Sequence, residues 1–225
     1  MANDDFYASP FGAVYSAYME RPRLSRLISR TVWGGDTKPY YDSMRAVAEV
    51  PDGGTIVDCP CGAGPAFRAL HPDRNVRYVA ADLSPAMLRR ARKRAEARGF
   101  TNIEFLQTDA TDIALPSSSA DLFVSFWGLH CYPDPGRALA EAARILAPGG
   151  RLVAATFLRG TDSLRQRLLI RPGLGDFGAV PTAEELERGL QAAGLTVARS
   201  DRSGPLLFFE AHAADTGVTE AHAPA

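Results

Sequence analysis

The 225-residue sequence has no long uninterrupted run of apolar residues and no excess of charge of either sign. It has 25 Lys and Arg against 26 Asp and Glu, so no global field would draw it onto nucleic acid or an anionic membrane. The segment MANDDFYASP carries acids where a secretory signal would carry bases, and no apolar stretch follows it. We therefore expect a cytoplasmic protein with no membrane insertion and no nucleic-acid partner.

Cysteine is scarce, with Cys59, Cys61 and Cys131 making an odd count. The first two lie too close together for an easy disulfide, which favours reduced thiols that pack as small hydrophobic side chains. A Cys-x-Cys pair without a partnering cluster of Cys or His lacks a closed set of zinc ligands. The sequence therefore predicts no metal site.

From residue 51 onward, short β-branched runs alternate with helical patterns, which is typical of a parallel sheet covered by helices on both faces. We expect an α/β, Rossmann-like, doubly wound sheet that is mostly parallel and has seven strands. The strands are predicted at 55–59, 76–82, 103–107, 120–126, 150–157, 196–202 and 205–211.

Capping signals mark two of the predicted helices. Ser84 and Pro85 suit the start of a helix over 85–98, and Gly99 suits its left-handed end. Thr182 and Glu185 form a capping box for a helix that ends near Gly194. Two more helices are predicted at about 65–70 and 135–147.

The chain is expected to form one domain. Residues 1–50 are rich in aromatics and predict a helical cover or lid of one or two helices, with Leu24, Leu27 and Ile28 on its apolar stripe. Such a cover is more often simply part of the core. Residues 51–211 form the ligand-binding domain, and 212–225 are predicted to be a frayed tail.

Acidic residues and glycines meet where the first two strands end. Asp58 ends the first strand, a turn containing Gly62 and Gly64 follows, and Asp82 ends the second strand. An acid at the end of that second strand is well placed to accept both hydroxyls of a ribose. The pattern therefore predicts an adenosine-containing ligand.

The turn discriminates among three such ligands. A dinucleotide fingerprint needs a third glycine where Phe67 stands, and a phosphate loop needs Lys-Ser or Lys-Thr where Ala66-Phe67 stands. Asp58 and Asp82 would repel a pyrophosphate but suit a ligand that bears an ammonium and a sulfonium.

These residues resemble the class I methyltransferases that use S-adenosylmethionine, of the small-molecule, ubiquinone/menaquinone-biosynthesis-like kind. The stretch from Asp58 to Gly64 is similar to the first motif of that family, Asp82-Leu83-Ser84 to its ribose-binding stretch, and Asp109-Ala110 to its adenine-binding pair. The likeness covers roughly residues 50 to 158. It implies S-adenosylmethionine as cofactor, S-adenosylhomocysteine as product, and the following cofactor-binding residues: Asp58, Pro60, Cys61, Gly62, Gly64, Asp82, Leu83, Met87, Asp109, Ala110 and Phe126. Pro60 departs from the family, which generally has glycine there, and removes one N–H donor from the turn.

The loop after the fourth strand, FWGLHCYPD, is the candidate for catalysis. Methyl transfer is an in-line displacement that depends mainly on alignment, and oxygen or nitrogen nucleophiles often also need a base. His130 is therefore the catalytic candidate, with a role in contacting cofactor or capping the loop as the even alternative. Trp127 is expected to contact substrate, as are Tyr7 and Tyr15 if the N-terminal segment closes as a lid.

Substrate class follows from what is missing. The loop lacks the Asn-Pro-Pro-Tyr tetrapeptide of base-modifying enzymes, and the basic run LRRARKRAEARG over 88–99 is interpreted as a solvated helix face. We expect transfer to an O, N or C nucleophile of a small, partly hydrophobic molecule, by a monomer or homodimer. Two alternatives stay open: a protein that binds S-adenosylmethionine without transferring methyl, and a nicotinamide-dependent oxidoreductase. The segment 158–180 would line a pocket or a dimer contact.

Overall fold

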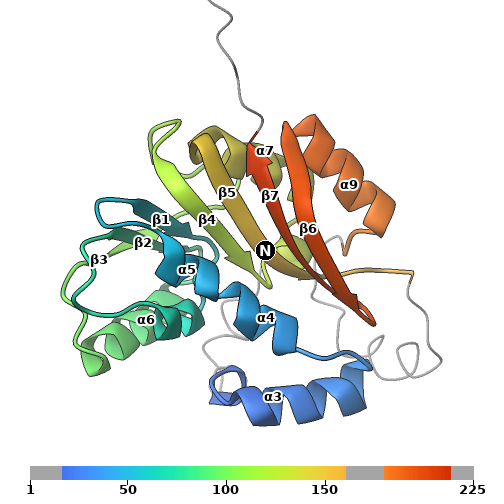
Figure 1. Cartoon of the computed structure of the whole chain (residues 1–225), viewed down its shortest axis with the longest axis horizontal. Coiled ribbons are helices and arrows are strands. Elements are labelled where there is room, and N and C mark those ends of the chain that lie inside the picture. Colours follow the sequence, from blue (N-terminus) through green and yellow to red (C-terminus); the bar gives the residue numbers. More distant parts are fainter. Residues whose placement is uncertain (1–16, 161–179, 214–225) are drawn as a thin grey trace, which may run out of the picture.

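A computed structural model describes residues 17–160 and 180–213 of the chain. Its centre is a seven-stranded sheet in the order β3-β2-β1-β4-β5-β7-β6 (Figure 1). Only β7 runs antiparallel to its neighbours; the pairs joining β3, β2, β1, β4 and β5 are all parallel. The strands are β1 (Thr55–Asp58), β2 (Arg77–Asp82), β3 (Ile103–Gln107), β4 (Ala120–Phe126), β5 (Leu146–Phe157), β6 (Leu195–Ser203) and β7 (Leu206–Ala213). The predicted fold class is confirmed.

Helices cover both faces of the sheet, and alternating residues of each strand feed two separate cores. Ile56, Tyr78 and Val124 face the side covered by α4, α5 and α6, whereas Val57 and Val79 face the side covered by α7 and α9. This period of two is what a strand buried on both faces requires. The helices are α3 (Pro22–Ile28), the π-helical η1 (Ser29–Trp33), α4 (Lys38–Ser43), α5 (Arg45–Glu49), the 3₁₀-helical η2 (Pro65–Ala69), α6 (Pro85–Ala97), the 3₁₀-helical η3 (Leu129–Cys131), α7 (Pro135–Ile145) and α9 (Ala183–Ala192).

The predicted helix signals act as expected. The Ser84 hydroxyl accepts a hydrogen bond from the backbone N–H of Met87 at 3.3 Å, and Gly99 follows the helix with φ of +78°. Thr182 and Glu185 form the reciprocal capping box at the start of α9. Most predicted boundaries differ by only one or two residues, but the segment at 65–69 is a 3₁₀ helix, and β5 begins at Leu146, before the Pro-Gly-Gly turn.

The described part of the N-terminal cover is part of the core. Tyr40, Met44 and Val47 are almost wholly buried and pack with strand residues of the first core. The predicted apolar stripe is wrong: Leu24 is 38% exposed and Leu27 62%, while the buried face of this helical segment holds Ser25 and Ser29. Small polar side chains allow the close approach here, and the hydroxyls of Ser25 and Thr37 lie 3.1 Å apart.

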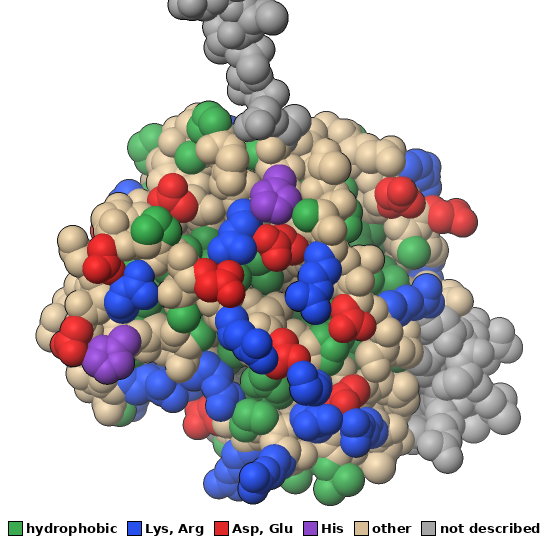
Figure 2. All heavy atoms as spheres, in the orientation of Figure 1, with side chains coloured by type: hydrophobic (Ala, Val, Ile, Leu, Met, Phe, Trp, Pro, Cys, Tyr) green, Lys and Arg blue, Asp and Glu red, His purple; other side chains and the backbone are tan. Residues whose placement is uncertain are grey.

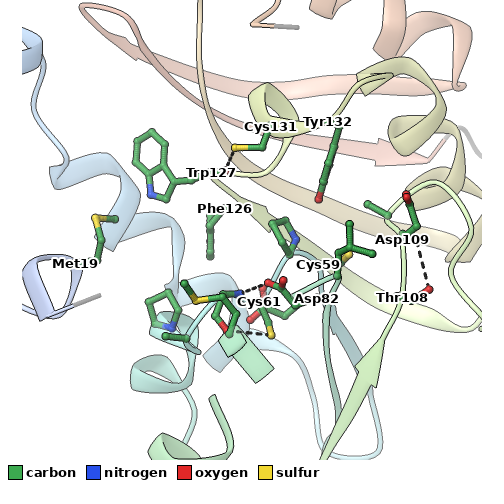
Figure 3. A pocket seen from close by; sticks show the side chains of 18 of the residues that line it. Met19, Cys59, Cys61, Asp82, Thr108, Asp109, Phe126, Trp127, Cys131 and Tyr132 are labelled. Carbon is green, nitrogen blue, oxygen red and sulfur yellow. Dashed lines mark hydrogen bonds between the residues drawn. The ribbon is translucent and has the colours of Figure 1, made fainter. Parts of the chain in front are cut away.

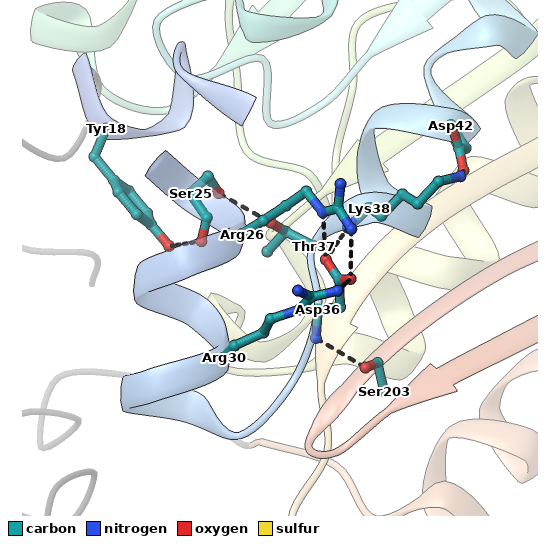
Figure 4. Close-up of polar contacts among 9 residues, drawn as sticks. All are labelled: Tyr18, Ser25, Arg26, Arg30, Asp36, Thr37, Lys38, Asp42 and Ser203. Atoms are coloured by element: carbon teal, nitrogen blue, oxygen red, sulfur yellow. Dashed lines mark hydrogen bonds and ion pairs between the residues drawn. The ribbon is translucent and has the colours of Figure 1, made fainter. Parts of the chain in front are cut away.

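Polar contacts fix this cover to the β6–β7 turn (Figure 4). Arg26 donates two hydrogen bonds to the Asp36 carboxylate, at 2.9 and 3.1 Å, and Arg30 donates a third at 2.6 Å. These cations, with the Lys38 backbone N–H, hold the pKa of Asp36 well below its usual range. The backbone N–H of Asp36 in turn donates to the Ser203 hydroxyl at 2.8 Å.

Some of the predictions concern residues outside the described ranges. Tyr7, Tyr15, most of the 158–180 segment and nearly all of the 212–225 tail lie outside the described residues. Among the residues that are described, no helix combines the length and the apolar character needed to cross a bilayer.

Candidate cofactor and substrate site

A cavity of about 230 Å³ lies at the carboxyl ends of β1, β2 and β4, where the strand order reverses (Figure 3). This is the position in open α/β sheets at which ligands bind. Asp58 and Asp82 enter it from the ends of neighbouring parallel strands. The strand pairing therefore brings together two acids that are 24 residues apart in the sequence.

Asp82 organises the glycine turn. Its carboxylate accepts the backbone N–H of Gly62 at 2.8 Å and that of Ser84 at 2.9 Å. Gly62 and Gly64 have φ of +53° and +74°, in the left-handed region that favours glycine. A Cβ on Gly64 would lie only 2.3 Å from the Phe67 ring, so Phe67 fills the space below the turn. The bulky residue that contradicted a dinucleotide fingerprint is thus wholly buried.

Asp58 lies deeper, and its side chain is almost fully buried. One oxygen accepts the hydroxyl of Tyr78 at 2.7 Å. Burial, with a smaller contribution from the Asp82 charge, raises the pKa of Asp58 to about 7, although the Tyr78 hydrogen bond opposes this shift. A ligand cation next to Asp58 would offset the desolvation cost of its carboxylate.

Cysteines and proline form the apolar wall of this end. Cys59 and Cys61 are buried, and burial raises the pKa of both thiols well above the usual range. They are therefore neutral and pack as small hydrophobic residues, as predicted. Pro60 packs against Gly128 of the β4 loop, where an added Cβ would lie 2.3 Å from the proline ring.

Aromatic side chains form the other end of the cavity. Tyr40 of α4 contacts Phe126 and Trp127, with ring centroids 5.2 and 5.3 Å apart. Trp127 has φ of +63°, rare for a bulky residue, which turns the chain sharply after β4. Its indole nitrogen is buried and has no hydrogen-bond partner among the residues that the structure describes.

His130 lies behind this aromatic end and is not among the described residues that line the cavity. The residue is 2% exposed, and its Nδ1 accepts the backbone N–H of Phe157 at 3.4 Å and lies 3.2 Å from the Thr156 hydroxyl. Burial lowers the pKa of His130 to about 3, so the ring is neutral at pH 7. This environment suits a residue that fixes the loop, not one that takes a proton from substrate.

The structure brings most of the predicted site residues together. Besides those above, Leu83, Met87, Asp109 and Ala110 line the cavity, and the Asp109 carboxylate accepts hydrogen bonds from the backbone and hydroxyl of Thr111. Gly64 shapes the turn without lining the cavity.

Several lining residues were not predicted: Met19, Tyr40, Arg94, Thr108, Cys131 and Tyr132. The Tyr132 hydroxyl points toward Cys59 and the cavity, and it is buried without a hydrogen-bond partner in the described part of the chain (Figure 3). The only feature of the sequence that could have indicated Tyr132 as a site residue is its place two residues after His130 in an aromatic loop. Met19 and Tyr40 come from the cover, whose docking no local pattern encodes.

The interpretation of the basic run over 88–99 as a solvated helix face is wrong for Arg94. Leu88, Ala91 and Ala95 form the buried stripe as expected. However, the Arg94 side chain is only 16% exposed, forms an ion pair with Glu20 and lines the cavity. Arg94 therefore does not belong to a solvated helix face.

Comparison with known proteins agrees with this site. Residues 57–154 match the family described as a methyltransferase domain. The crystal structure of geranyl diphosphate C-methyltransferase from Streptomyces coelicolor A3(2), in complex with Mg²⁺, geranyl-S-thiolodiphosphate and S-adenosyl-L-homocysteine, has a TM-score of 0.67 at 16% identity and covers 79% of this chain and 76% of that one. That likeness shows a shared fold.

Two sequence relatives are more similar. A demethylmenaquinone methyltransferase of Thermus thermophilus is 35% identical over 164 residues, which cover 63% of this chain and 74% of that protein. An uncharacterized chloroplastic methyltransferase of Arabidopsis thaliana is 33% identical over 195 residues, 80% of this chain, and the chain spans about half of its length. The paired acids, glycine turn and cavity fit S-adenosylmethionine, and the chain belongs to the class I S-adenosylmethionine-dependent methyltransferases of the kind that resembles the ubiquinone- and menaquinone-biosynthesis enzymes.

Proposed function

We propose that this protein transfers the methyl group of S-adenosylmethionine to a small, partly apolar molecule that enters beside Phe126 and Trp127. The observation that carries the proposal is one cavity with two acids at one end and aromatic rings at the other. The acids suit a cationic cofactor, and the rings suit an apolar acceptor. The names of the relatives, among them demethylmenaquinone methyltransferases, favour a ring-bearing acceptor such as a quinol.

The role proposed for each cofactor residue follows from its position. Asp82 accepts the ribose hydroxyls while its backbone contacts hold the glycine turn in place. Asp58 faces the ammonium group, which keeps its carboxylate ionised. Asp109 accepts the exocyclic amine of adenine, and Leu83, Met87 and Ala110 enclose the base.

The chemistry supplied by the cofactor is an electrophilic methyl on a sulfonium. The protein contributes alignment and exclusion of water through Phe126, Trp127 and Tyr40. His130 cannot readily act as the base, because its ring is buried and its Nδ1 already accepts a backbone N–H. This favours an acceptor that is already nucleophilic at neutral pH, such as an electron-rich ring carbon or a phenolate.

The test is to incubate the purified protein with methyl-labelled S-adenosylmethionine and reduced naphthoquinones and benzoquinones that lack one ring methyl. Label in the organic phase, with a product heavier by one methyl group, supports the proposal. The matched control is Asp82→Ala, which should abolish labelling while the protein remains folded.

Two other outcomes count against it. Label only in precipitated protein or nucleic acid would mean a macromolecular acceptor. The other outcome is tight binding of S-adenosylhomocysteine with no labelled product, even when a crude small-molecule extract is supplied as the source of acceptor. It would favour the alternative that this protein binds the cofactor without transferring methyl.

A further inference from the structure

A second hollow, of about 430 Å³, lies beside the cofactor cavity between η2, α6 and the N-terminal segment. Its charged lining residues are Glu20, Arg68, Arg90, Lys93, Arg94 and Arg98. The two hollows share Met19, Pro65 and Arg94. We call this hollow the cationic groove.

The cationic groove differs in its charge balance from the face over α4, α5 and the β6–β7 pair. On the face over α4, α5 and the β6–β7 pair, basic and acidic side chains are interspersed (Figure 2), as in the ion pairs of Asp42 with Lys38 and Arg45. The cationic groove gathers five cations and one carboxylate within the described residues. Because the whole chain has a net charge of −1, this concentration is local.

The cations come from η2 and from α6 with its C-terminal end, and they line one hollow. Arg68 is in η2, where its guanidinium lies over the Tyr41 ring, 5.2 Å from the centroid. Lys93, Arg94 and Arg98 project from the α6 side. Arg94 forms an ion pair with Glu20, and burial, together with the charge of Arg98, lowers the pKa of Arg94 to about 10. An anion between these side chains would relieve their mutual repulsion.

We propose that the cationic groove binds a phosphate-bearing group, next to the cofactor cavity and separate from it. A phosphate or diphosphate offers several acceptor oxygens, enough for guanidinium groups from both elements. The groove is a single small hollow and not a long basic stripe, which favours one phosphorylated small molecule or lipid headgroup over a nucleic-acid strand. This inference does not depend on the identity of the methyl acceptor.

The test is calorimetric titration of inorganic pyrophosphate into protein saturated with S-adenosylhomocysteine, so that the cofactor cavity is filled. The groove variant Lys93→Ala/Arg98→Ala removes two exposed cations that lie outside the cofactor cavity. The matched control, Arg89→Ala/Arg92→Ala, removes the same charge from the same helix outside the cationic groove. We expect pyrophosphate affinity to fall at least tenfold in the groove variant and less than twofold in the control.

A vesicle experiment distinguishes the two sources of phosphate. Cosedimentation is measured with phosphatidylcholine vesicles with and without phosphatidylglycerol, using the same two variants. Pyrophosphate binding without cosedimentation supports a free phosphorylated molecule, and cosedimentation lost only in the groove variant supports a lipid headgroup. Equal loss in both variants, or no binding of either probe to the protein saturated with S-adenosylhomocysteine, would overturn the proposal. Because S-adenosylhomocysteine affinity is measured in the same samples, failure of the cofactor site would be recognised separately.

Discussion

The same edge of one sheet carries two different chemistries. At the ends of β1 and β2 the side chains are Asp58 and Asp82, both almost fully buried. At the ends of β4 and β5 they are Phe126 and Phe157, with Trp127 packed between them and the cover. The cavity joins the two halves, so one ligand end meets charge and the other meets rings.

Each half of the cavity obtains its selectivity in a different way. The acidic half is rigid because its carboxylates already accept backbone and tyrosine hydrogen bonds, and it discriminates by charge. The aromatic half is built by side chains from β4, β5 and α4, and it discriminates by shape and exclusion of water. Mutations in the acidic half should therefore change cofactor affinity, and mutations in the aromatic half should change acceptor kinetics.

The largest effect is expected for Asp82→Ala. The substitution removes a charged acceptor for the ribose and also frees the N–H groups of Gly62 and Ser84. At roughly 1.5–3 kcal/mol for each lost hydrogen bond to a charged group, two ribose contacts correspond to a loss of 100-fold or more in affinity. Calorimetric titration of the variant with S-adenosylhomocysteine measures this loss of affinity.

Glu104→Ala is the control for that measurement. Glu104 is an acid of the neighbouring strand β3 that pairs with Arg77 outside the cavity. We expect its affinity for S-adenosylhomocysteine to match the wild type. An Asp82→Ala protein that binds normally would show that the cofactor does not use this half of the cavity.

The second prediction concerns pH and Asp58. Because burial raises the pKa of this carboxyl to about 7, the group is protonated and neutral in the cofactor-free protein at lower pH, so it attracts a cationic ligand only weakly. Affinity for S-adenosylmethionine should fall about tenfold for each pH unit below 7, by proton linkage. Titrations from pH 5.5 to 7.5 measure the slope.

Stability should change in the opposite direction. The proton held by Asp58 stabilises the cofactor-free fold at low pH, and this contribution is lost as the pH rises through about 7. The melting temperature of the free protein should therefore fall as the pH rises from about 4 to about 7 and level off above that, and bound cofactor should reduce the fall. Asp58→Asn should flatten both profiles, and a wild-type affinity that is constant below pH 7 would contradict the assignment.

Sequence patterns were most informative in the acidic half. Asp58, the glycine turn and Asp82 follow one another along the chain at fixed distances, and parallel strand pairing alone brings them together. Local rules of strand ends and turns are therefore sufficient to place them. The caps at Ser84 and Thr182 were predictable for the same reason.

The aromatic half could not be predicted as well, because it depends on tertiary packing. Tyr40 and Met19 reach the cavity because the cover, held together by the Ser25–Thr37 contact, docks on the sheet where Asp36 meets Ser203, and no periodicity reveals these contacts. The leucine pattern of α3 even indicated the wrong face. His130 was singled out by residue type and loop position, which do not report burial.

A smaller effect is expected for Trp127→Phe. The ring and its contacts with Tyr40 and Phe157 are largely kept, and only the buried indole N–H is lost. If that N–H donates to the acceptor molecule, KM for the acceptor should rise by up to about tenfold, the value of one ordinary hydrogen bond. S-adenosylhomocysteine affinity should not change. Trp33→Phe, which alters another ring against Phe157 outside the cavity, is the matched control.

The smallest effect on turnover is expected at His130, and it decides what the loop histidine does. Its Nδ1 accepts the Phe157 N–H, so a positioning role predicts that His130→Asn lowers thermal stability while kcat stays within a few fold of wild type. Because burial lowers the pKa of His130 to about 3, protonation opposes folding, and the stability it contributes should decline as the pH falls below 6.5. With cofactor and acceptor both saturating, kcat should show no imidazole inflection between pH 6 and 8. The opposite result would be an inflection in the wild-type kcat in that range that disappears in His130→Asn, together with a hundredfold loss of kcat. It would make His130 the general base and would place proton transfer in the aromatic half of the cavity.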